Sequence, residues 1–158
     1  MVRTIGKDPS EIKLLEDVEK FGWHCLNILA EDELPPYSFT VGLYHSYQHP
    51  ELMIFGLPAN LAHQILRIAA DAIKSGKPIN LELPTEELLR GYSCCFVEVP
   101  VSHYEENMGF CRWFYEGDSF PLYQIVWPSR EGHFPWHPAA SESFRSIQPV
   151  LGASHHGA

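Results

Sequence analysis

The sequence predicts a single α+β domain with a mainly antiparallel sheet and about three helices packed on it. A length of 158 residues fits one domain, and a hydrophobic fraction of 45% supplies a substantial core. The local patterns follow the order helix, three strands, helix, strand, helix, strand. Short connections join the early strands, which favours antiparallel pairing over a doubly wound parallel sheet. We expect one domain over residues 1–151 and a disordered tail over residues 152–158.

The first helix is predicted over residues 9–20 by the signals at its ends. Asp8 can cap the N-terminus, Pro9 suits the first helical position, and Glu11 completes the capping-box spacing. Gly22 can end the helix. The next segment, WHCLNIL at residues 23–29, is predicted to be a strand.

The stretch SFTVGLYHSYQHPELMIFGLP, residues 38–58, predicts two strands around a histidine-rich turn. The strands would cover residues 37–44 and 52–57. Because side chains alternate along a strand, Phe39 and Val41 would face the core, and Ser38 and Thr40 would face the opposite way beside Gly42. Small hydroxyls next to a glycine allow a helix, water or a ligand to approach the backbone closely. The simpler interpretation of this polar face is that it is exposed to solvent.

The later elements are predicted from spacing and end signals. A second helix begins after Pro58, shows one apolar face and stops near Gly76. One helical turn is expected at residues 86–89, a strand at residues 92–100 and a third helix from about residue 102 to 115. The segment PLYQIVWP, residues 121–128, predicts the last strand.

The charge balance disfavours two classes of partner. The formal net charge is −9, from 20 acidic and 11 basic residues. Binding to nucleic acid or to an anionic membrane depends on dense lysines and arginines, which here are few and scattered. The chain shows no signal-peptide pattern and no apolar run long enough for a membrane span, so we expect a cytoplasmic protein with reduced cysteines.

Several separate segments together resemble a bacterial family, the domain of unknown function 4262. They are FGWHCLNIL, PPYSFTVGLYHSYQHPELMIFGLP, LLRGYSCCFVEVP, FPLYQIVWP and EGHFPWHP, in this order. The resemblance covers residues 18–151. The family pattern carries an acidic residue after Trp-Pro and another after Phe-Pro-Trp, and this chain has Ser129 and His137 at those places. The family label implies no activity.

A shorter segment, residues 23–76, resembles flavin-binding split barrels. In those proteins a strand and turn rich in threonine and serine hold the flavin phosphate. The resemblance implies a split-barrel-like sheet and such a role for Ser38, Thr40, His45 and Ser46. It also makes flavin a candidate cofactor.

The histidines suggest a divalent metal ion as the other candidate cofactor. His45 and His49 share the i, i+4 spacing of His133 and His137, which on a helix would place two imidazoles on one face. Pro50 and Pro135 argue against helix at both places, so a metal would need ligands from distant loops, with His103 or Glu98 as a third. The simpler interpretation is that these histidines form hydrogen bonds within the protein or face solvent.

Four more side chains are candidates for ligand binding. Glu98 and Gln124 each lie on an otherwise apolar face of a strand. Glu98 is expected at an edge of the sheet or partly buried with a raised pKa, and a buried Gln124 would need hydrogen-bond partners. Trp127 belongs to a late run of aromatic residues that is mostly core. Trp136, between two prolines, would pack as a plug over the sheet and could wall a pocket whose floor is Ser38 and Thr40.

Two function classes follow from these patterns. The first is a small-molecule-binding domain, with or without enzymatic activity, whose pocket lies between the Ser38/Thr40 strand face, the His45–His49 turn and the His133–His137 segment. The second is a non-catalytic protein-interaction module, such as an immunity, regulatory or assembly component, for which the acidic surface suits a basic partner. No nucleophile motif, phosphate-binding loop or dinucleotide fingerprint is present, so the sequence names no reaction.

Overall fold

The structure is a computed structural model that describes residues 1–153. Its helices are α1 (Pro9–Phe21), α2 (Leu43–Tyr47), α3 (Ala59–Lys74), α4 (Tyr104–Asn107), α5 (Gly109–Tyr115) and α6 (Glu142–Ile147), with a 3₁₀ turn, η1 (Val101–His103). Its strands are β1 (His24–Ile28), β2 (Tyr37–Val41), β3 (Glu51–Phe55), β4 (Thr85–Leu89), β5 (Tyr92–Glu98) and β6 (Leu122–Val126). The predicted α+β class is confirmed. The tail expected at residues 152–158 lies mostly outside the described residues.

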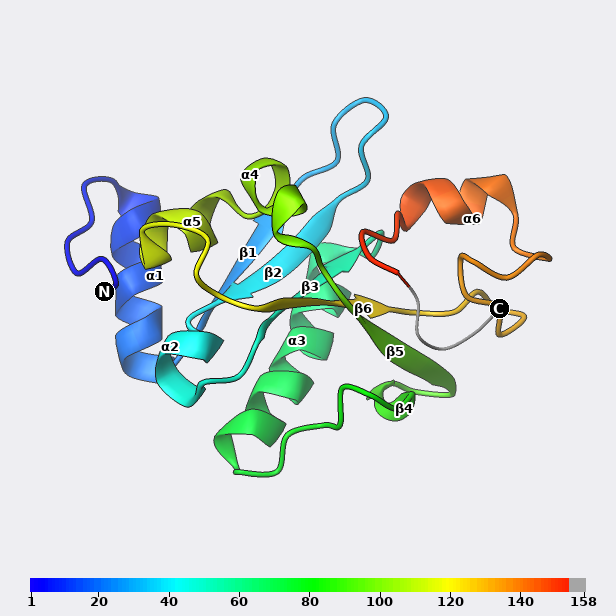
Figure 1. Ribbon diagram of the computed structural model, residues 1–158, viewed down its shortest axis with the longest axis horizontal. Coiled ribbons are helices and arrows are strands. Elements are labelled where there is room, and N and C mark those ends of the chain that lie inside the picture. The colour runs from blue at the N-terminus through cyan, green and yellow to red at the C-terminus, as the bar shows by residue number, and fades with distance from the viewer. Residues whose placement is uncertain (154–158) are drawn as a thin grey trace.

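The strands form one open, six-stranded sheet in the order β1-β2-β3-β6-β5-β4 (Figure 1). All neighbours pair antiparallel except β3 and β6, which pair parallel. The described sheet is therefore mostly antiparallel, as predicted, and β1 and β4 are its two edges. Since the edges do not meet, the sheet is not a closed barrel.

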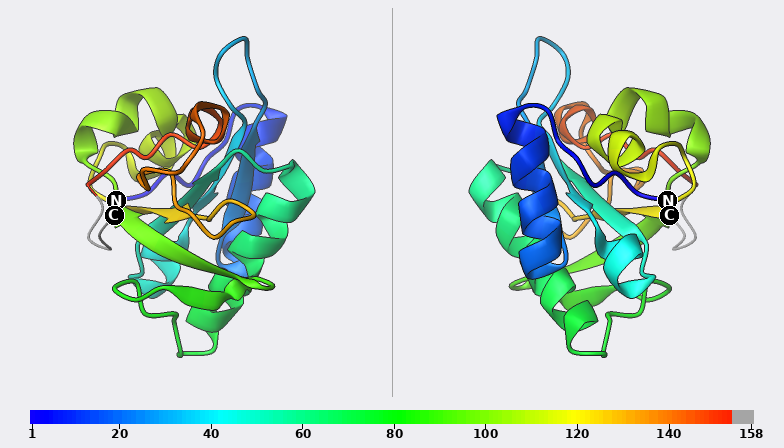
Figure 2. Two further views of the ribbon diagram at one scale, coloured as in Figure 1. Left: turned by 90° about the vertical axis from the view of Figure 1, so that its right-hand side faces the viewer. Right: turned by 90° about the vertical axis from the view of Figure 1, so that its left-hand side faces the viewer.

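Helices and loops cover both faces of the sheet (Figure 2). On one face, α3 packs its Ile65 and Leu66 against Leu52, Ile54 and Ile125. On the other face, α1, α4 and α5 cover β2 and β3. The C-terminal segment, residues 129–151, covers β5 and β6 on that second face. There Phe134 and Trp136 contact Cys95, Val97 and Val126.

End signals set α1 and α3 as predicted. The Asp8 side chain accepts from the Glu11 amide, and Gly22 ends α1 in the left-handed conformation. α3 follows Pro58 directly and ends at Lys74. No helix among the described residues is long and apolar enough to cross a membrane.

Three predictions about elements need correction. The strand predicted at residues 37–44 ends at Val41, because Gly42 has a φ of 113° and turns the chain into α2. The turn predicted as helical at residues 86–89 is strand β4, which forms a hairpin with β5 through Gly91 at a φ of 82°. The helix predicted at residues 102–115 is divided at Met108 into α4 and α5.

Candidate functional site

The predicted polar face of β2 is buried, and this corrects the interpretation as a solvated sheet face. Ser38 is 2% exposed and Thr40 is fully buried. Ser38 pairs across the sheet with Ile54, a residue of the core beneath α3, so both hydroxyls lie on the α3 face. The Ser38 hydroxyl donates to the side-chain oxygen of Asn27 at 2.7 Å.

Thr40 belongs to a closed cluster whose centre is Glu51, a residue that sequence reasoning missed. The Thr40 hydroxyl donates to a Glu51 oxygen at 2.7 Å, and the Leu52 amide donates to Thr40 at 2.9 Å. The Glu51 carboxylate also accepts from the amides at the start of α2, those of Gly42, Leu43 and Tyr44, at 2.9–3.2 Å. The Tyr115 hydroxyl from α5 is the last donor.

The Glu51 cluster is a structural cap for the turn between β2 and α2. Glu51 has no exposed surface. Burial raises the pKa of its carboxyl, and the hydroxyl and amide donors oppose that shift. Because every neighbour donates, the cluster suits an accepting carboxylate and leaves no donor for a ligand. The signal in the sequence was Glu51 itself, nine residues after Gly42, in the segment that resembles the family.

The first histidine pair does not converge on one site. His45 lies exposed on α2, with its ring edge-on to Phe114 at 5.6 Å between centroids. His49 follows the helix and is half-buried, and its Nδ1 lies 2.8 Å from the Pro50 carbonyl. Burial lowers the pKa of His49, which favours a neutral ring.

The second histidine pair stacks in the C-terminal segment. The rings of His133 and His137 are parallel within 7° with centroids 4.0 Å apart, and His137 Nδ1 accepts from the Ala139 amide. Trp136 lies between these two histidines in the sequence and packs against β5 and β6. This is the face of the sheet opposite the one that carries Ser38 and Thr40. The three segments of the predicted pocket therefore do not enclose one cavity.

Gln124 and Trp127 attach the C-terminal segment to the sheet. The fully buried Gln124 amide donates to the Pro149 carbonyl at 2.7 Å and accepts from the Leu151 amide at 2.9 Å. The Trp127 indole N–H donates to the Phe55 carbonyl, and its backbone exchanges two hydrogen bonds with the Gln148 side chain. Glu98 is exposed at the end of β5. The expectation that a buried glutamine has partners is confirmed.

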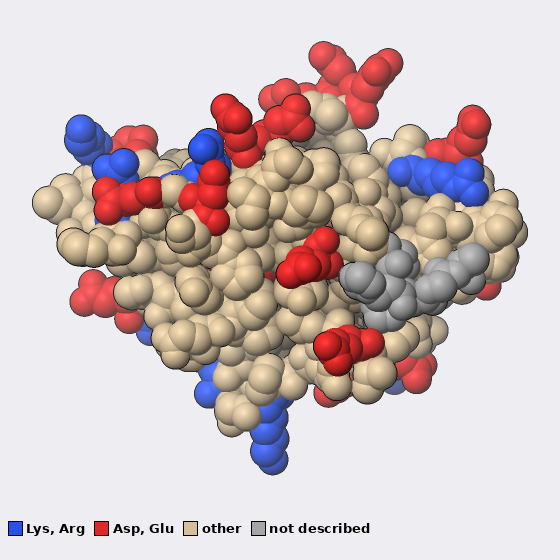
Figure 3. Space-filling view, in the orientation of Figure 1, with Lys and Arg blue, Asp and Glu red and all other residues tan. Residues whose placement is uncertain are grey.

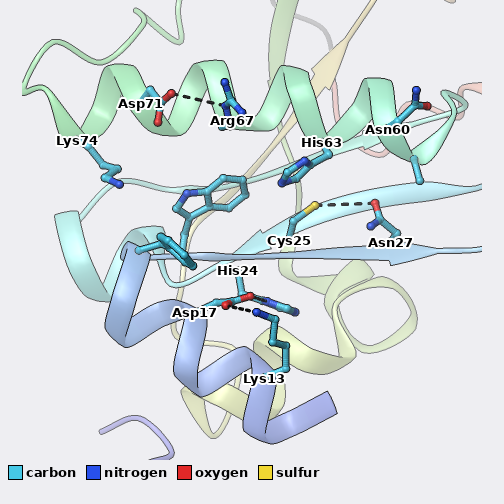
Figure 4. A pocket seen from close by; sticks show the side chains of 13 residues that line it. Lys13, Asp17, His24, Cys25, Asn27, Asn60, His63, Arg67, Asp71 and Lys74 are labelled. Atoms are coloured by element: carbon cyan, nitrogen blue, oxygen red, sulfur yellow. Dashed lines mark hydrogen bonds and ion pairs between the residues drawn. The ribbon is translucent and has the colours of Figure 1, made fainter. Parts of the chain in front are cut away.

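A different hollow carries a concentration of polar groups, and it runs along the free edge of β1. This groove has a volume of about 560 Å³ and lies between α1, β1 and α3 (Figure 4). Among the described strands β1 pairs with β2 alone, and its other edge faces the groove. We call it the β1 groove. Its polar lining is Lys13 and Asp17 from α1, His24, Cys25 and Asn27 from β1, and Asn60, His63, Arg67, Asp71 and Lys74 from α3.

An Asp–His pair lies where α1 meets β1. His24 Nδ1 lies 2.7 Å from Asp17, which also accepts from Lys13 at 2.8 Å. Burial of Asp17 opposes ionisation, but the hydrogen bonds from Lys13 and His24 prevail and lower the pKa of Asp17. This bond holds the His24 ring by one nitrogen and leaves Nε2 outside the pair.

The opposite wall, on α3, offers exposed groups with few internal partners. His63 stacks on the buried Trp23 with ring centroids 6.0 Å apart. Arg67 lies 3.9 Å from Asp71, whereas Lys74 takes part in no ion pair among the described residues. Asn60 is exposed, with no hydrogen bond from its side chain to another described residue.

The cysteines give no support to a thiol nucleophile, because burial raises the pKa of each one. All four are free. Burial raises the pKa of Cys25, the only one that lines the groove, to about 11, so its thiol stays protonated near neutral pH. Its Sγ lies 3.9 Å from the Asn27 side-chain oxygen. No group of three or more metal-binding side chains occurs within the described part of the chain.

The comparison with protein families identifies the chain. The family model described as a domain of unknown function, DUF4262, matches residues 17–141. The chain belongs to this family. No curated protein and no solved structure matches it, so the resemblance to split barrels has no structural neighbour in support. The segments that suggested this DUF4262 domain include all of the Glu51 cluster except Tyr115, and they include β1, the strand along the groove.

Proposed function

We propose that this DUF4262 domain binds a small organic anion with an aromatic or heteroaromatic ring in the β1 groove. The observation that carries the proposal is the convergence of rings and cations on one hollow at the sheet edge. Phe21 is 44% exposed at the groove, and His63 is exposed above Trp23. These rings offer faces against which a ligand ring can pack.

The size of the groove supports a small ligand. Its volume of about 560 Å³ lies inside the range of about 300–1,000 Å³ that is usual for small-molecule sites. Exposed amides of Asn27 and Asn60 lie along it and can orient a polar ligand. The Asn27 side-chain oxygen already accepts a hydrogen bond from Ser38. The N–H groups of the Asn27 side chain are therefore the donors available to a ligand.

The charges in the groove support an anion. Three cationic side chains, Lys13, Arg67 and Lys74, line it beside two carboxylates, those of Asp17 and Asp71. The groove therefore has a small excess of positive charge, although the whole chain has a net charge of −9. Lys13 and Arg67 are each paired with a carboxylate, whereas Lys74 has no ion pair within the described chain and can meet a ligand.

The pocket predicted around Ser38, Thr40 and the two histidine pairs draws less support as the binding site. The hydroxyls of Ser38 and Thr40 already donate inside the protein. A flavin phosphate at this place would have to displace those bonds. The proposed function therefore keeps the class of small-molecule binding and moves the site to the neighbouring edge strand.

The test is a titration with four probes that share one ring and differ in charge. Benzoate and phenyl phosphate are anionic, benzyl alcohol is neutral and benzamidine is cationic. In two-dimensional ¹⁵N NMR spectra of the whole chain, the anions should shift the amides of β1 and of residues 59–74, with Kd values of about 1 mM. Benzamidine should shift them less or not at all.

Two lysine variants supply the matched pair for this test. Lys74→Glu should weaken benzoate binding by roughly tenfold, because it places a like charge against the anion. Lys77→Glu makes the same change three residues later, outside the groove lining, and should alter the Kd by less than about twofold. Equal binding of benzoate and benzamidine, or shifts that avoid the groove, would contradict the proposal.

A further inference from the structure

A second hollow lies on another part of the molecule and shares no lining residue with the β1 groove. It is a cleft of about 520 Å³ between the β1–β2 hairpin, α4 and the end of the C-terminal segment. In Figure 1 the hairpin rises beyond the sheet next to α4. We call this hollow the hairpin cleft.

The floor and one wall of the hairpin cleft are apolar. Tyr37 and Phe55 meet on the floor with ring centroids 5.1 Å apart, and the Tyr37 hydroxyl donates to the Asn107 carbonyl at 2.9 Å. Leu29 and Leu34 in the hairpin are 79% and 66% exposed and also line the cleft. Large aliphatic side chains left so open beside an aromatic floor are typical of a docking surface.

The rim of the cleft is acidic. Glu31 from the hairpin and Glu106 from α4 line it together with His103, and no lysine or arginine of the described chain does. Asp32, Glu33 and Glu105 are the exposed neighbours of these two residues in the chain. Figure 3 shows acidic side chains gathered over the hairpin and α4. Positive charge on a binding partner would therefore be attracted to this rim.

We propose that the hairpin cleft docks a segment of a partner protein in which aliphatic side chains alternate with lysines or arginines. The aliphatic side chains pack on Leu29, Leu34 and the half-buried Tyr37. The cations meet Glu31 and Glu106. An anionic membrane surface is disfavoured as the occupant, because the acidic rim repels its headgroups. This inference is independent of ligand binding in the β1 groove.

The test is a selection from a random 12-residue peptide library against the whole chain, with counter-selection on a double variant. Leu29→Ser with Leu34→Ser removes the open aliphatic wall. Both side chains are mostly exposed, so the fold should persist, which the melting temperature checks. The expected enriched peptides carry both aliphatic residues and lysines or arginines.

Binding of one enriched peptide then separates the apolar and electrostatic contributions. The double serine variant should raise its Kd about tenfold or more. Glu31→Gln with Glu106→Gln should raise it about fivefold at low ionic strength, and this effect should shrink as salt is added. The control is Leu83→Ser with Glu86→Gln, which changes an exposed leucine and glutamate elsewhere and should leave the Kd unchanged.

Four outcomes of the peptide experiments would overturn the proposal. They are a selection that enriches nothing, enriched peptides that are acidic or uncharged, equal binding to the double serine variant, and an equal loss in the control variant. Binding of the chain to phosphatidylglycerol vesicles through the same leucines would replace the protein partner by a membrane. Lys74→Glu should leave peptide binding intact, which separates this result from that of the β1 groove.

Discussion

The Glu51 cluster and the β1 groove are both built from polar side chains near one edge of the sheet. They differ in how many of those side chains already have hydrogen-bond or ion-pair partners within the protein. In the cluster, Glu51 is fully buried and accepts from Thr40, from Tyr115 and from the amides at the start of α2. In the groove, Asn60 and His63 are exposed, and Lys74 is outside any ion pair among the described residues.

This difference separates a structural role from a binding role. A buried polar group is stable only when its hydrogen bonds are made, so the cluster is complete without a ligand. An exposed group that is bonded to water can exchange that water for a ligand. Changes in the cluster should therefore reduce the free energy of unfolding, whereas changes in the groove should leave it nearly constant and alter binding.

The largest effect is expected at the centre of the cluster. Glu51→Ala should lower the free energy of unfolding by about 3–5 kcal/mol, because it leaves buried donors without their acceptor. Glu51→Gln should cost about 2–3 kcal/mol, because the amide N–H₂ would face other donors. Urea denaturation followed by tryptophan fluorescence measures both values.

Tyr115→Phe provides the graded control for Glu51. It removes one donor to the carboxylate and the acceptor of the His45 amide, and it keeps the ring that stacks on Phe120. Its expected cost is about 1–2 kcal/mol. If Glu51→Ala destabilised the protein no more than Tyr115→Phe does, Glu51 would not be the centre of a structural cap.

A smaller loss is expected from Gly42→Ala, at the turn that the cluster caps. Gly42 has a φ of 113°, and an added Cβ would lie 2.9 Å from the Gly22 carbonyl oxygen. Conformational strain and this contact together should cost about 2–3 kcal/mol. Gly76→Ala is the matched control, since Gly76 has a φ of 83° and open space around it, and it should cost about 1 kcal/mol in the same denaturation experiment. Equal losses at the two positions would mean that the contact with Gly22 contributes nothing.

The sequence predicts those parts of the fold that local signals determine. The ends of α1 follow from Asp8, Pro9 and Gly22. Strands β5 and β6 were predicted from short apolar runs alone. The errors lie where a distant contact decides. The alternating pattern of β2 continues past Val41, but Glu51 caps the helix that begins there. β4 is a strand because it pairs with β5, and α6 was missed because it is six residues long and contributes a single buried side chain, Phe144.

The candidate site was less predictable for the same reason. Ser38 and Thr40 are distinctive in the sequence, yet the partner that buries Thr40 comes from β3. The groove takes its polar residues from three elements, and only β1 lies in a segment that resembles the family, with nothing in that segment to indicate a groove. Its cations on α3, Arg67 and Lys74, have the spacing of an ordinary solvated helix face. Only the position of β1 at the edge of the sheet turns that face into the wall of a groove.

The smallest effect on stability is expected within the groove, at Asp17. Asp17→Asn should lower the free energy of unfolding by about 0.5–1 kcal/mol at neutral pH, because the side chain is partly exposed and its bonds to Lys13 and His24 are weakened rather than removed. The pKa of Asp17 is lower in the folded protein than its ordinary value of 3.8. The stability that this carboxylate contributes is therefore present above that pH and is lost as the pH falls through the folded pKa. Denaturation of the native chain and the variant from pH 7 to pH 3 should show the two curves converging at the acidic end. Curves that stay parallel would contradict this prediction, because they would show that the ionisation of Asp17 contributes no stability to the folded chain.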